Sequence, residues 1–556
     1  MTPGPKDELL FVPLGGAGEI GMNLNLYGYG PAGDEDWLMI DLGVTFNDGE
    51  LPGIDVIMPD PTFIEERRDR LLGLVLTHAH EDHLGAVQYL WPRLKCPIYA
   101  TPFTVSVLKR KLQETSFAAD VEIIEVPLAG RFSLGPFDLE LVTLTHSIPE
   151  PNAIALRSPL GTVLHTGDWK FDPDPVVGEP ADEETLRRIG EEGALAVVCD
   201  STNVFTPGDS GSEADILDNL TEIIARCTGQ VAVACFATNV ARLETIATAA
   251  ARNDRDVVLA GRSLKRITEA ARENGYMQDV PAFLMEEDAG FLPDDKTLLI
   301  CTGSQGEPRA ALSRIASGDH PRIAMNPGDT LVFSSRVIPG NERAIAELQA
   351  KFIRRGVHII TPKDAMIHVS GHPARDELAR MYQHLRPSIA IPVHGELRHL
   401  TEHAALARTC QVPHAIVNEN GGAVRLAPGA PGVIDHVSVG RLAADGNRLV
   451  PIASEIVKSR TRAMWHGFAV VTVILDRGEV DEEMPISTTG LLDDEDDPIL
   501  DTVRLAVREA IDRLSPVAED ADDHTVSEAA RIAARRSFKD LFDKRPITRV
   551  HLVRLD

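Results

Sequence analysis

The chain has 556 residues, 43% of them hydrophobic, and its 55 basic side chains against 84 acidic ones give a formal charge of −29. The length exceeds the roughly 250–300 residues at which a single hydrophobic core stops growing, and the apolar content excludes wholesale disorder, so we expect several folded domains. The charge argues against a nucleic-acid ligand, because phosphate backbones favour basic surfaces, and the lack of an apolar run of about 18 residues argues against a membrane span.

Short β-like runs dominate the chain up to residue 200. From residue 215 to 360 each apolar run is followed by a helix-length segment, which predicts a parallel α/β sheet. The expected strands cover residues 24–29, 37–41, 73–77, 137–145 and 162–165 in the first part, and 231–236, 256–260, 297–301 and 330–333 in the second.

The C-terminal part has its own composition. Residues 430–460 show no regular pattern and predict a linker, whereas strands at 468–475 and 551–555 with two helical segments predict a small α/β domain. Residues 476–528 hold 18 acidic and 4 basic side chains, almost half of the net charge. The acidic run at 493–497 predicts a solvated loop before a helix, with a docking surface as the alternative.

A glycine-rich segment near the start, GAGEIG at residues 16–21, matches the string of a dinucleotide-binding loop. Such a loop must open a helix, because the helix N-terminus binds the pyrophosphate. Residues 22–27 instead alternate with a period of two, which predicts a strand. We therefore expect these glycines to shape a turn near an active site.

The segment LVLTHAHEDHLG at residues 74–85 holds three histidines and an aspartate within six positions. In an extended loop His78 and His80 project to the same side. A helix is expected to follow, which puts Asp82 and His83 at its start and lets them face a second point. Imidazole and carboxylate ligands suit Zn²⁺ or Mn²⁺, so the segment predicts half of a two-metal site.

This segment resembles the ligand motif of the metallo-β-lactamase fold superfamily, and the other ligands of that superfamily follow in order, each at or just after an expected strand. Asp41 is expected to support the ligand loop from behind. The resemblance implies one metal held by His78, His80 and His146, a second held by Asp82 and His83, and Asp168 bridging the two.

Further motifs narrow the resemblance. VCDSTN at 198–203, IHVSGH at 367–372 and PVHGE at 392–396 are similar to motifs of the β-CASP nucleases, in which an α/β domain is inserted into the metallo-β-lactamase fold. Stretches that resemble the ribonuclease J family are GGAGEIGMN at 15–23, HSIPE at 146–150, TGSQGEP at 302–308 and PGNE at 339–342. The resemblance covers essentially the full chain.

The implied fold is α/β: a metallo-β-lactamase αββα sandwich with an inserted β-CASP α/β domain and a small C-terminal α/β domain. The expected divisions are 1–205 and 362–435 for the two parts of the sandwich, 206–361 for the β-CASP domain, 436–462 for a linker and 463–556 for the C-terminal domain.

The implied activity is that of a metal-dependent ribonuclease. It would combine 5′→3′ exonucleolytic degradation, favouring 5′-monophosphorylated RNA, with endonucleolytic cleavage, in mRNA decay and in rRNA or other RNA processing. Two divalent ions per subunit are expected, zinc first and manganese as the alternative. The resemblance assigns His394 to the second metal. It implies that His368 protonates the leaving oxygen and that Asp200 orients this histidine. It also implies a further catalytic role for Asp82.

A pocket for a 5′-phosphate is expected beside His368, where hydroxyl, N–H and imidazole groups offer donors. The family usually has serine at the position of Thr238, a change that keeps the hydroxyl and adds a methyl group. For Arg336, which departs from the family pattern, a phosphate contact and a surface position both stay open. The expected phosphate contacts are Ser370, Gly371, His372, Thr238 and Asn239.

The expected location is cytoplasmic, because the six cysteines are scattered without a CxxC pair and the first residues lack the form of a signal peptide. Expected partners are single-stranded RNA, further copies of the chain in a homodimer or homotetramer, and an RNA helicase or other degradation-complex proteins, with no membrane. RNA affinity would then come from a local basic groove on an otherwise acidic particle.

Three alternatives stay open. One is a small-ester or lactone hydrolase on the same metal scaffold, which the inserted region and the His368 and His394 motifs disfavour. Another is a β-CASP nuclease that acts on DNA. The third is a non-catalytic scaffold, disfavoured because no expected ligand is missing.

Overall fold

The computed structural model describes residues 6–47, 49–338, 340–477, 479–493, 497–514 and 522–555. Two compact units contain them, one of Met1–Phe46 with Val56–Gly440 and the other of Asn47–Asp55 with Arg441–Asp556. Residues 494–496 of the acidic run expected to form a solvated loop lie outside the described residues. Within the part that is described, none of the helices is long and apolar enough to cross a membrane.

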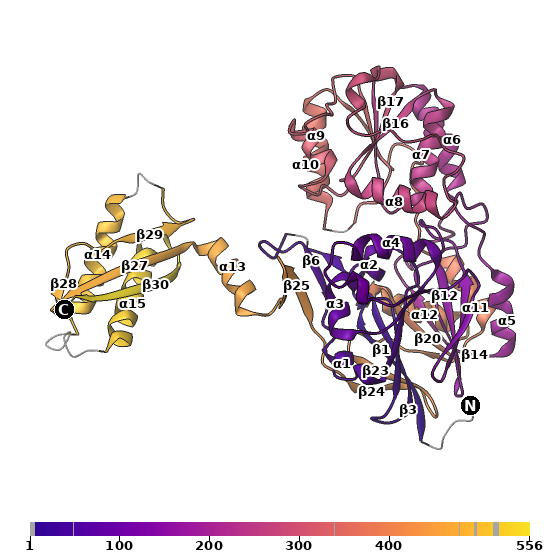
Figure 1. Ribbon diagram of the computed structural model, residues 1–556, viewed down its shortest axis with the longest axis horizontal. Coiled ribbons are helices and arrows are strands. Elements are labelled where there is room, and N and C mark those ends of the chain that lie inside the picture. Colours follow the sequence, from indigo (N-terminus) through magenta and orange to yellow (C-terminus); the bar gives the residue numbers. More distant parts are fainter. Residues whose placement is uncertain are drawn as a thin grey trace. The chain divides into compact units, whose positions relative to one another are not determined.

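Two β-sheets packed face to face form the base of the first unit (Figure 1). One consists, in spatial order, of β24 (Gly432–His436), β23 (Gly422–Ala427), β1 (Asp7–Gly15), β3 (Leu24–Pro31), β4 (Asp36–Ile40), β7 (Leu71–Val75), β8 (Ile98–Ala100) and β9 (Ile123–Glu125). The other consists of β10 (Arg131–Leu134), β11 (Phe137–Thr143), β12 (Asn152–Ser158), β13 (Gly161–His165), β14 (Ala194–Asp200), β20 (Ile389–Val393) and β22 (His414–Ala415). Apolar side chains of both sheets, among them Tyr27, Leu139 and Ile391, share one core.

Helices cover this sandwich. Leu186, Leu378 and Leu406 bring three helices onto the outer face of the second sheet, where they share a core with its strands. The helices of this layer are α5 (Glu183–Glu192), α11 (Arg375–Leu385) and α12 (Leu397–Thr409). Those that accompany the first sheet are α1 (Thr62–Glu65), α2 (Glu81–Leu84), α3 (Val87–Leu94) and α4 (Pro102–Leu112). The expected αββα arrangement is confirmed.

An α/β domain is inserted between β14 and β20. Its strands are all parallel and run in the order β16 (Asp256–Ala260), β17 (Thr297–Cys301), β15 (Val231–Ala234), β18 (Thr330–Phe333) and β19 (His358–Ile360). Its helices are α6 (Ala214–Ala225), α7 (Val240–Arg252), α8 (Arg262–Glu273), α9 (Ala311–Ser317) and α10 (Glu342–Arg354). The β/α alternation of the sequence therefore predicted this sheet correctly.

The second unit has its own core, which includes Val471, Val503 and Phe538. Its long strand β27 (Phe468–Asp476) pairs with β28 (Glu479–Val480), β29 (Ile486–Thr489) and, in parallel, β30 (Ile547–Leu555), with helices α14 (Asp497–Asp512) and α15 (Asp523–Phe542) beside them. The lack of regular elements expected near 436–462 is wrong, whereas the role of this segment as a linker stays a prediction. That segment contains β25 (Arg441–Asp445), β26 (Arg448–Pro451) and most of α13 (Glu455–His466).

Short elements complete the chain and bear on two expectations. No helix follows the glycine-rich segment; it leads into β3, as the period-two pattern predicted. The strand expected to reach Thr77 ends at Val75, because the N–H of Thr77 leaves the sheet to donate to Asp41. The short elements are β2 (Ala17–Gly18), β5 (Thr45–Phe46), β6 (Val56–Pro59), β21 (Gly395–Glu396) and 3₁₀ turns at Arg68–Arg70, Ala118–Asp120, Ala289–Phe291 and Asp294–Lys296.

Candidate metal centre

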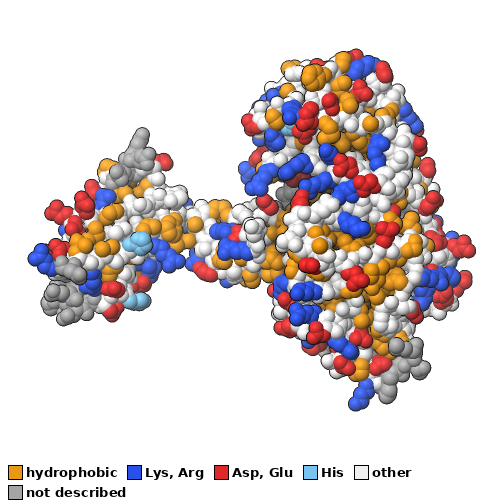
Figure 2. Space-filling view, viewed as in Figure 1, with side chains coloured by type: hydrophobic (Ala, Val, Ile, Leu, Met, Phe, Trp, Pro, Cys, Tyr) orange, Lys and Arg blue, Asp and Glu red, His pale blue; other side chains and the backbone are white. Residues whose placement is uncertain are grey.

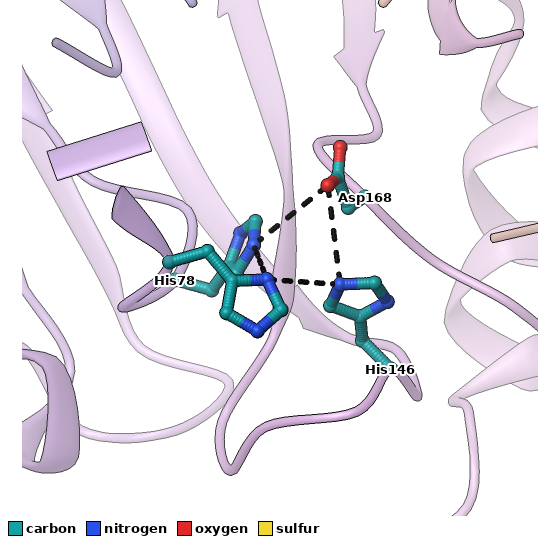
Figure 3. Close-up of side chains that lie close together, drawn as sticks. His78, His146 and Asp168 are labelled. Atoms are coloured by element: carbon teal, nitrogen blue, oxygen red, sulfur yellow. Dashed lines mark hydrogen bonds and ion pairs between the residues drawn. The ribbon is translucent and has the colours of Figure 1, made fainter. Parts of the chain in front are cut away.

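Three histidines converge beside the carboxylate of Asp168, and Figure 3 shows His78, His146 and Asp168 pointing toward one another. His80 Nδ1 lies 3.0 Å from His78 Nε2 and 3.1 Å from His146 Nε2. The Oδ2 atom of Asp168 is 3.9 Å from both His78 Nε2 and His146 Nε2. These donors surround one point at a spacing that a single cation could bind.

A second group of donors shares Asp168 with the first. Asp82 and His83 stand in α2, and His394 directly follows β20. The Oδ2 atom of Asp168 is 3.2 Å from His83 Nε2 and 3.6 Å from His394 Nε2. Asp82 Oδ2 is 3.7 Å from the same two nitrogens. The structure thus brings together every residue that the sequence put forward as a metal ligand.

The chemistry around Asp168 fits divalent cations. This residue is 3% exposed, and its Oδ1 atom has no hydrogen-bond partner among the described residues. Burial opposes the ionised carboxylate, but the positive charges of His394 and His83 hold the pKa of Asp168 well below its usual value. Burial also lowers the pKa of His78 and His146 well below the usual range, which leaves these imidazoles neutral at neutral pH. A buried carboxylate oxygen without a donor, beside neutral imidazoles, is suited to a metal ion.

Asp41 lies behind the ligand loop. Its carboxylate accepts hydrogen bonds from the backbone N–H and the hydroxyl of Thr77, both at 2.8 Å. Its Oδ2 atom also lies 2.6 Å from His83 Nδ1. A proton on His83 Nδ1 leaves Nε2 free to face Asp168, so Asp41 fixes both the loop and the ring orientation.

Asn23 contacts the metal centre although the sequence did not single it out. It is 3% exposed, and its Nδ2 donates to the backbone oxygen of Asp82 at 3.0 Å. The same amide group lies 3.1 Å from His394 Nδ1. Asn23 ends the stretch GGAGEIGMN, and Gly16 in that stretch accepts a hydrogen bond from the backbone N–H of His394 at 2.6 Å. The glycine-rich segment therefore lies beside the metal centre, as expected. The sequence did not identify Asn23, at the end of the same stretch, as part of the centre.

Gly371 contacts His146 through its backbone oxygen, which lies 2.5 Å from His146 Nδ1. A Cβ atom at this position would stand 2.6 Å from the His146 ring, so glycine is required here by space. The expectation for Gly371 was a phosphate contact through its N–H. Its carbonyl has a separate task, because it holds the proton of His146 Nδ1 and leaves Nε2 to face Asp168.

Asp200 pairs with His372 and not, as expected, with His368. The Asp200 Oδ2 atom lies 2.8 Å from His372 Nδ1. Burial opposes a charge on His372, but the carboxylates of Asp200 and Asp168 outweigh it and raise the pKa of His372 to about 9. His368 Nδ1 lies 3.4 Å from Arg242 Nη1, and burial together with that positive charge lowers the pKa of His368 to about 3. The expected pairing of Asp200 with His368 is therefore wrong, and the guanidinium beside His368 disfavours the protonated form of this imidazole.

The loop expected to bind phosphate leads into the same pair. Ser370 Oγ accepts a hydrogen bond from Asn203 Nδ2 at 2.7 Å, and Asn203 Nδ2 also donates to the backbone oxygen of His372 at 3.0 Å. Arg336, although exposed, donates to Asn203 Oδ1. Arg336 is therefore at the surface and is linked to the loop through one asparagine; a phosphate contact stays a prediction.

The other expected phosphate contacts, Thr238 and Asn239, stand at the start of α7. Asn239 Oδ1 caps this helix by accepting a hydrogen bond from the backbone N–H of Arg242 at 2.8 Å. The N–H of Ala241 lies 3.4 Å from the backbone oxygen of Ser147, the neighbour of a candidate ligand. The structure thus sets the N-terminus of α7 against the loop of the first ligand group.

Arg242 is the second residue that sequence reasoning missed. It is fully buried, and its guanidinium forms an ion pair with Glu213, with Nη2 2.9 Å from Oε2. It also donates to Ser334 Oγ at 2.7 Å and to the backbone oxygen of Ile367 at 3.1 Å. The Arg242 side chain thus joins two segments. One leads into the inserted domain at Glu213, and the other returns to the sandwich at Ile367, just before His368.

Comparisons with known protein families agree along the chain. The model described as "Metallo-beta-lactamase superfamily" matches residues 27–223, and "Ribonuclease J, beta-CASP domain" matches 228–351. "Zn-dependent metallo-hydrolase RNA specificity domain" matches 364–417, and "Ribonuclease J C-terminal domain" matches 455–555. The matched ranges include the ligand loop, four of the five strands of the inserted sheet, the loop at His368–His372 and the C-terminal strands.

Individual relatives extend over nearly the whole chain. A ribonuclease J of Sinorhizobium meliloti is 44% identical over 552 residues, which cover 99% of this chain and 98% of the relative. The corresponding proteins of Mycolicibacterium smegmatis and Thermus thermophilus are 36% and 33% identical, covering 98% and 86% of this chain and 97% and 84% of theirs. A crystal structure of a protein of unknown function from Enterococcus faecalis shares the fold, with a TM-score of 0.51, 16% identity, and coverage of 75% of this chain and 100% of that one.

Proposed function

The chain belongs to the ribonuclease J family of metal-dependent nucleases, and we propose that it degrades single-stranded RNA from the 5′ end, favouring a 5′-monophosphate, and also cleaves internal bonds. One observation carries the proposal: two groups of ligands share Asp168, and the carboxylate–imidazole pair of Asp200 and His372 lies directly beside them. Zinc is the proposed metal, with manganese as the alternative. The proposed setting is mRNA decay and rRNA processing in the cytoplasm, as a homodimer or homotetramer, with an RNA helicase or other degradation-complex proteins as partners.

The proposed mechanism assigns a separate task to each group of side chains. When bound, two divalent ions lower the pKa of water and neutralise charge on a phosphoryl group. The ligands that would hold them are His78, His80 and His146 on one side, Asp82, His83 and His394 on the other, and Asp168 between them. Asp200 accepts a hydrogen bond from His372 Nδ1, so that the other ring nitrogen can donate a proton to the departing 3′-oxygen. We propose this role for His372 in place of His368.

A 5′-monophosphate is the proposed ligand of the adjacent loop. The Ser370 hydroxyl, the Gly371 N–H and the hydroxyl and amide of Thr238 and Asn239 supply donors from both the sandwich and the inserted domain. Arg336, held by Asn203, adds a positive charge on the same side. An RNA whose 5′ end is fixed there would present its first phosphodiester to the metal centre.

The test compares 5′-monophosphorylated with 5′-triphosphorylated RNA of one sequence, with His80→Ala as the control. We expect mononucleotides from the monophosphorylated RNA, dependent on added Zn²⁺ or Mn²⁺, and almost none from the triphosphorylated RNA. An unchanged rate in His80→Ala would refute the metal assignment. Equal degradation of single-stranded DNA would refute the choice of RNA.

A further inference from the structure

Asn23 contacts the second ligand group at three points. Its Nδ2 donates to the backbone oxygen of Asp82 at 3.0 Å and lies 3.2 Å from His83 Nε2, and its amide lies 3.1 Å from His394 Nδ1. Its backbone N–H donates to the same Asp82 oxygen at 2.9 Å. Its contacts therefore reach every member of this group except Asp168.

The amide has one orientation that suits a bound cation. His394 Nε2 faces the carboxylates of Asp82 and Asp168 at 3.7 and 3.6 Å, so this nitrogen must be free of a proton to bind a metal. The proton then sits on Nδ1, which donates to Oδ1 of Asn23, while the NH₂ group of Asn23 donates to the Asp82 backbone. One side chain thus sets the tautomer of one ligand and the position of another.

The surroundings leave Asn23 little freedom. A Cβ atom on Gly16 would stand 2.2 Å from Asn23 Oδ1, and Gly16 has φ +86, a conformation that favours glycine. The backbone oxygen of Asn23 accepts a hydrogen bond from Gly43 at 2.9 Å, and that of Gly16 accepts one from His394 at 2.6 Å. His394 itself has φ 52, and its bond to Gly16 holds this strained backbone in place.

We propose that Asn23 is a positioning residue for the second metal: by accepting a hydrogen bond from His394 Nδ1 and donating one to the Asp82 backbone, it sets the affinity of that site and leaves the first site unaffected. The inference rests on the proposed two-metal function. Hydrogen-bonded partners behind ligands typically contribute about 10–100-fold in metal affinity. Asn23→Ala should lose a factor of that size at one metal only.

The experiment measures zinc bound to the purified full-length protein by mass spectrometry after dialysis against graded chelator, without RNA. The variants are Asn23→Ala, Asn23→Ser and Asn23→Asp, which keeps the acceptor for His394. Asn25→Ala is the matched control, since Asn25 is equally buried in β3 but its Oδ1 has no hydrogen-bond partner among the described residues. The unfolding temperature of each metal-free variant checks the fold, and Asn23→Ser replaces Asn23→Ala if the latter unfolds.

We expect the parent and Asn25→Ala to retain two zinc ions where Asn23→Ala or Asn23→Ser retains one, with Asn23→Asp closer to the parent. Two ions with parental affinity in Asn23→Ala would overturn the inference, as would equal loss of both ions or equal loss in Asn25→Ala. A parent that binds only one ion would instead refute the proposed two-metal function. The two failures are therefore distinguishable.

Discussion

Two histidines four positions apart in one loop meet opposite charges. His372 faces the carboxylate of Asp200 at 2.8 Å, and His368 faces the guanidinium of Arg242 at 3.4 Å. A proton donor gains from the carboxylate, which holds the ring in place and stabilises its charge. Both residues are histidines, so only their partners indicate which of them is suited to donate a proton.

We expect His372→Ala to lower the rate of bond cleavage by about 10²–10⁴-fold, the usual contribution of general acid catalysis. His368→Ala should lower it much less, because this imidazole is neutral and faces a cation. Single-turnover rates on one RNA at saturating enzyme measure the difference. A larger loss of cleavage rate in His368→Ala than in His372→Ala would identify His368 as the proton donor instead.

The sequence could predict the ligands but not the residues that hold them. His78, His80, Asp82 and His83 stand together in six positions, and their types are those that metals require. Asn23 is an ordinary polar residue whose partner His394 is 371 positions away, so its role exists only in the fold. The pairing of Asp200 with His372 likewise depends on which of two nearby imidazoles the backbone brings within reach.

At the scale of elements, α7 is joined to the rest of the first unit by a buried ion pair. Arg242 and Glu213 are 0% and 5% exposed, so removal of one charge leaves the other uncompensated. We expect Arg242→Ala to lower the free energy of unfolding by about 3–5 kcal/mol, and to slow degradation from the 5′ end more than internal cleavage. Urea unfolding and the two cleavage rates measure these effects.

The same helix supplies the control. Arg252 pairs with Asp218 at 3.1 Å, but both side chains are exposed. Such a pair contributes about 0–1 kcal/mol, so Arg252→Ala should leave stability and both activities nearly unchanged. Equal effects of the two substitutions would mean that the buried pair does not join the segments around α7.

Glu140 on β11 joins its neighbours through three arginines. Its carboxylate lies 2.5 Å from Arg131 on β10, 2.7 Å from Arg157 on β12 and 2.6 Å from Arg188 on α5. Burial works against ionisation, but hydrogen bonds from Arg188, Arg131 and Arg157 lower the pKa of Glu140 to about 2. The ion pairs therefore stabilise the fold only while this carboxylate is ionised.

Glu140→Gln should lower the free energy of unfolding at pH 7 by about 1–2 kcal/mol, after allowance for solvent screening at the exposed Arg131 and the partly exposed Arg157 and Arg188. Because the folded pKa is depressed, the stabilisation is complete above the unfolded value of about 4.3 and is lost as the pH falls toward 2. The difference between parent and Glu140→Gln should thus shrink across that interval. A difference that stays constant from pH 6 to pH 3 would exclude the ion pairs as its source.

Elements were predictable where their pattern is local. Four of the five parallel strands in the inserted sheet are continuous apolar runs and lie close to their expected positions, whereas the short edge strand β19 was not predicted. The strand β7 ends early because the N–H of Thr77 donates to Asp41, the residue that follows β4. The sequence shows no sign of that contact. The hairpin of β25 and β26 was missed because both strands are only four or five residues long.

For the whole molecule, the charge of −29 does not describe the surface that RNA would meet. Figure 2 shows basic side chains gathered where the inserted domain meets the sandwich, with acidic ones among them. Ion pairs also join α8 to α4 and the residues just after it: Arg266 pairs with Glu114, and Arg110 with Glu273. The expected basic groove stays a prediction. It would require more basic side chains at this surface than the acidic side chains that pair with them.

Metal removal should act on one unit only. The ligands come from loops spread from His78 to His394, all in the first unit, whereas the second unit has a separate core. A metal that binds only the folded state raises the free energy of unfolding by about 4 kcal/mol at a thousandfold excess over its Kd, because the apparent stability rises with RT ln(1 + [M]/Kd).

In calorimetry we expect chelation to move the unfolding transition of the first unit to lower temperature and zinc to restore it. The transition of the second unit should stay in place. In Asp168→Ala, which lacks the shared ligand, the chelator should have little effect; a chelator shift that persists there, or that moves both transitions alike, would contradict a metal centre confined to the first unit.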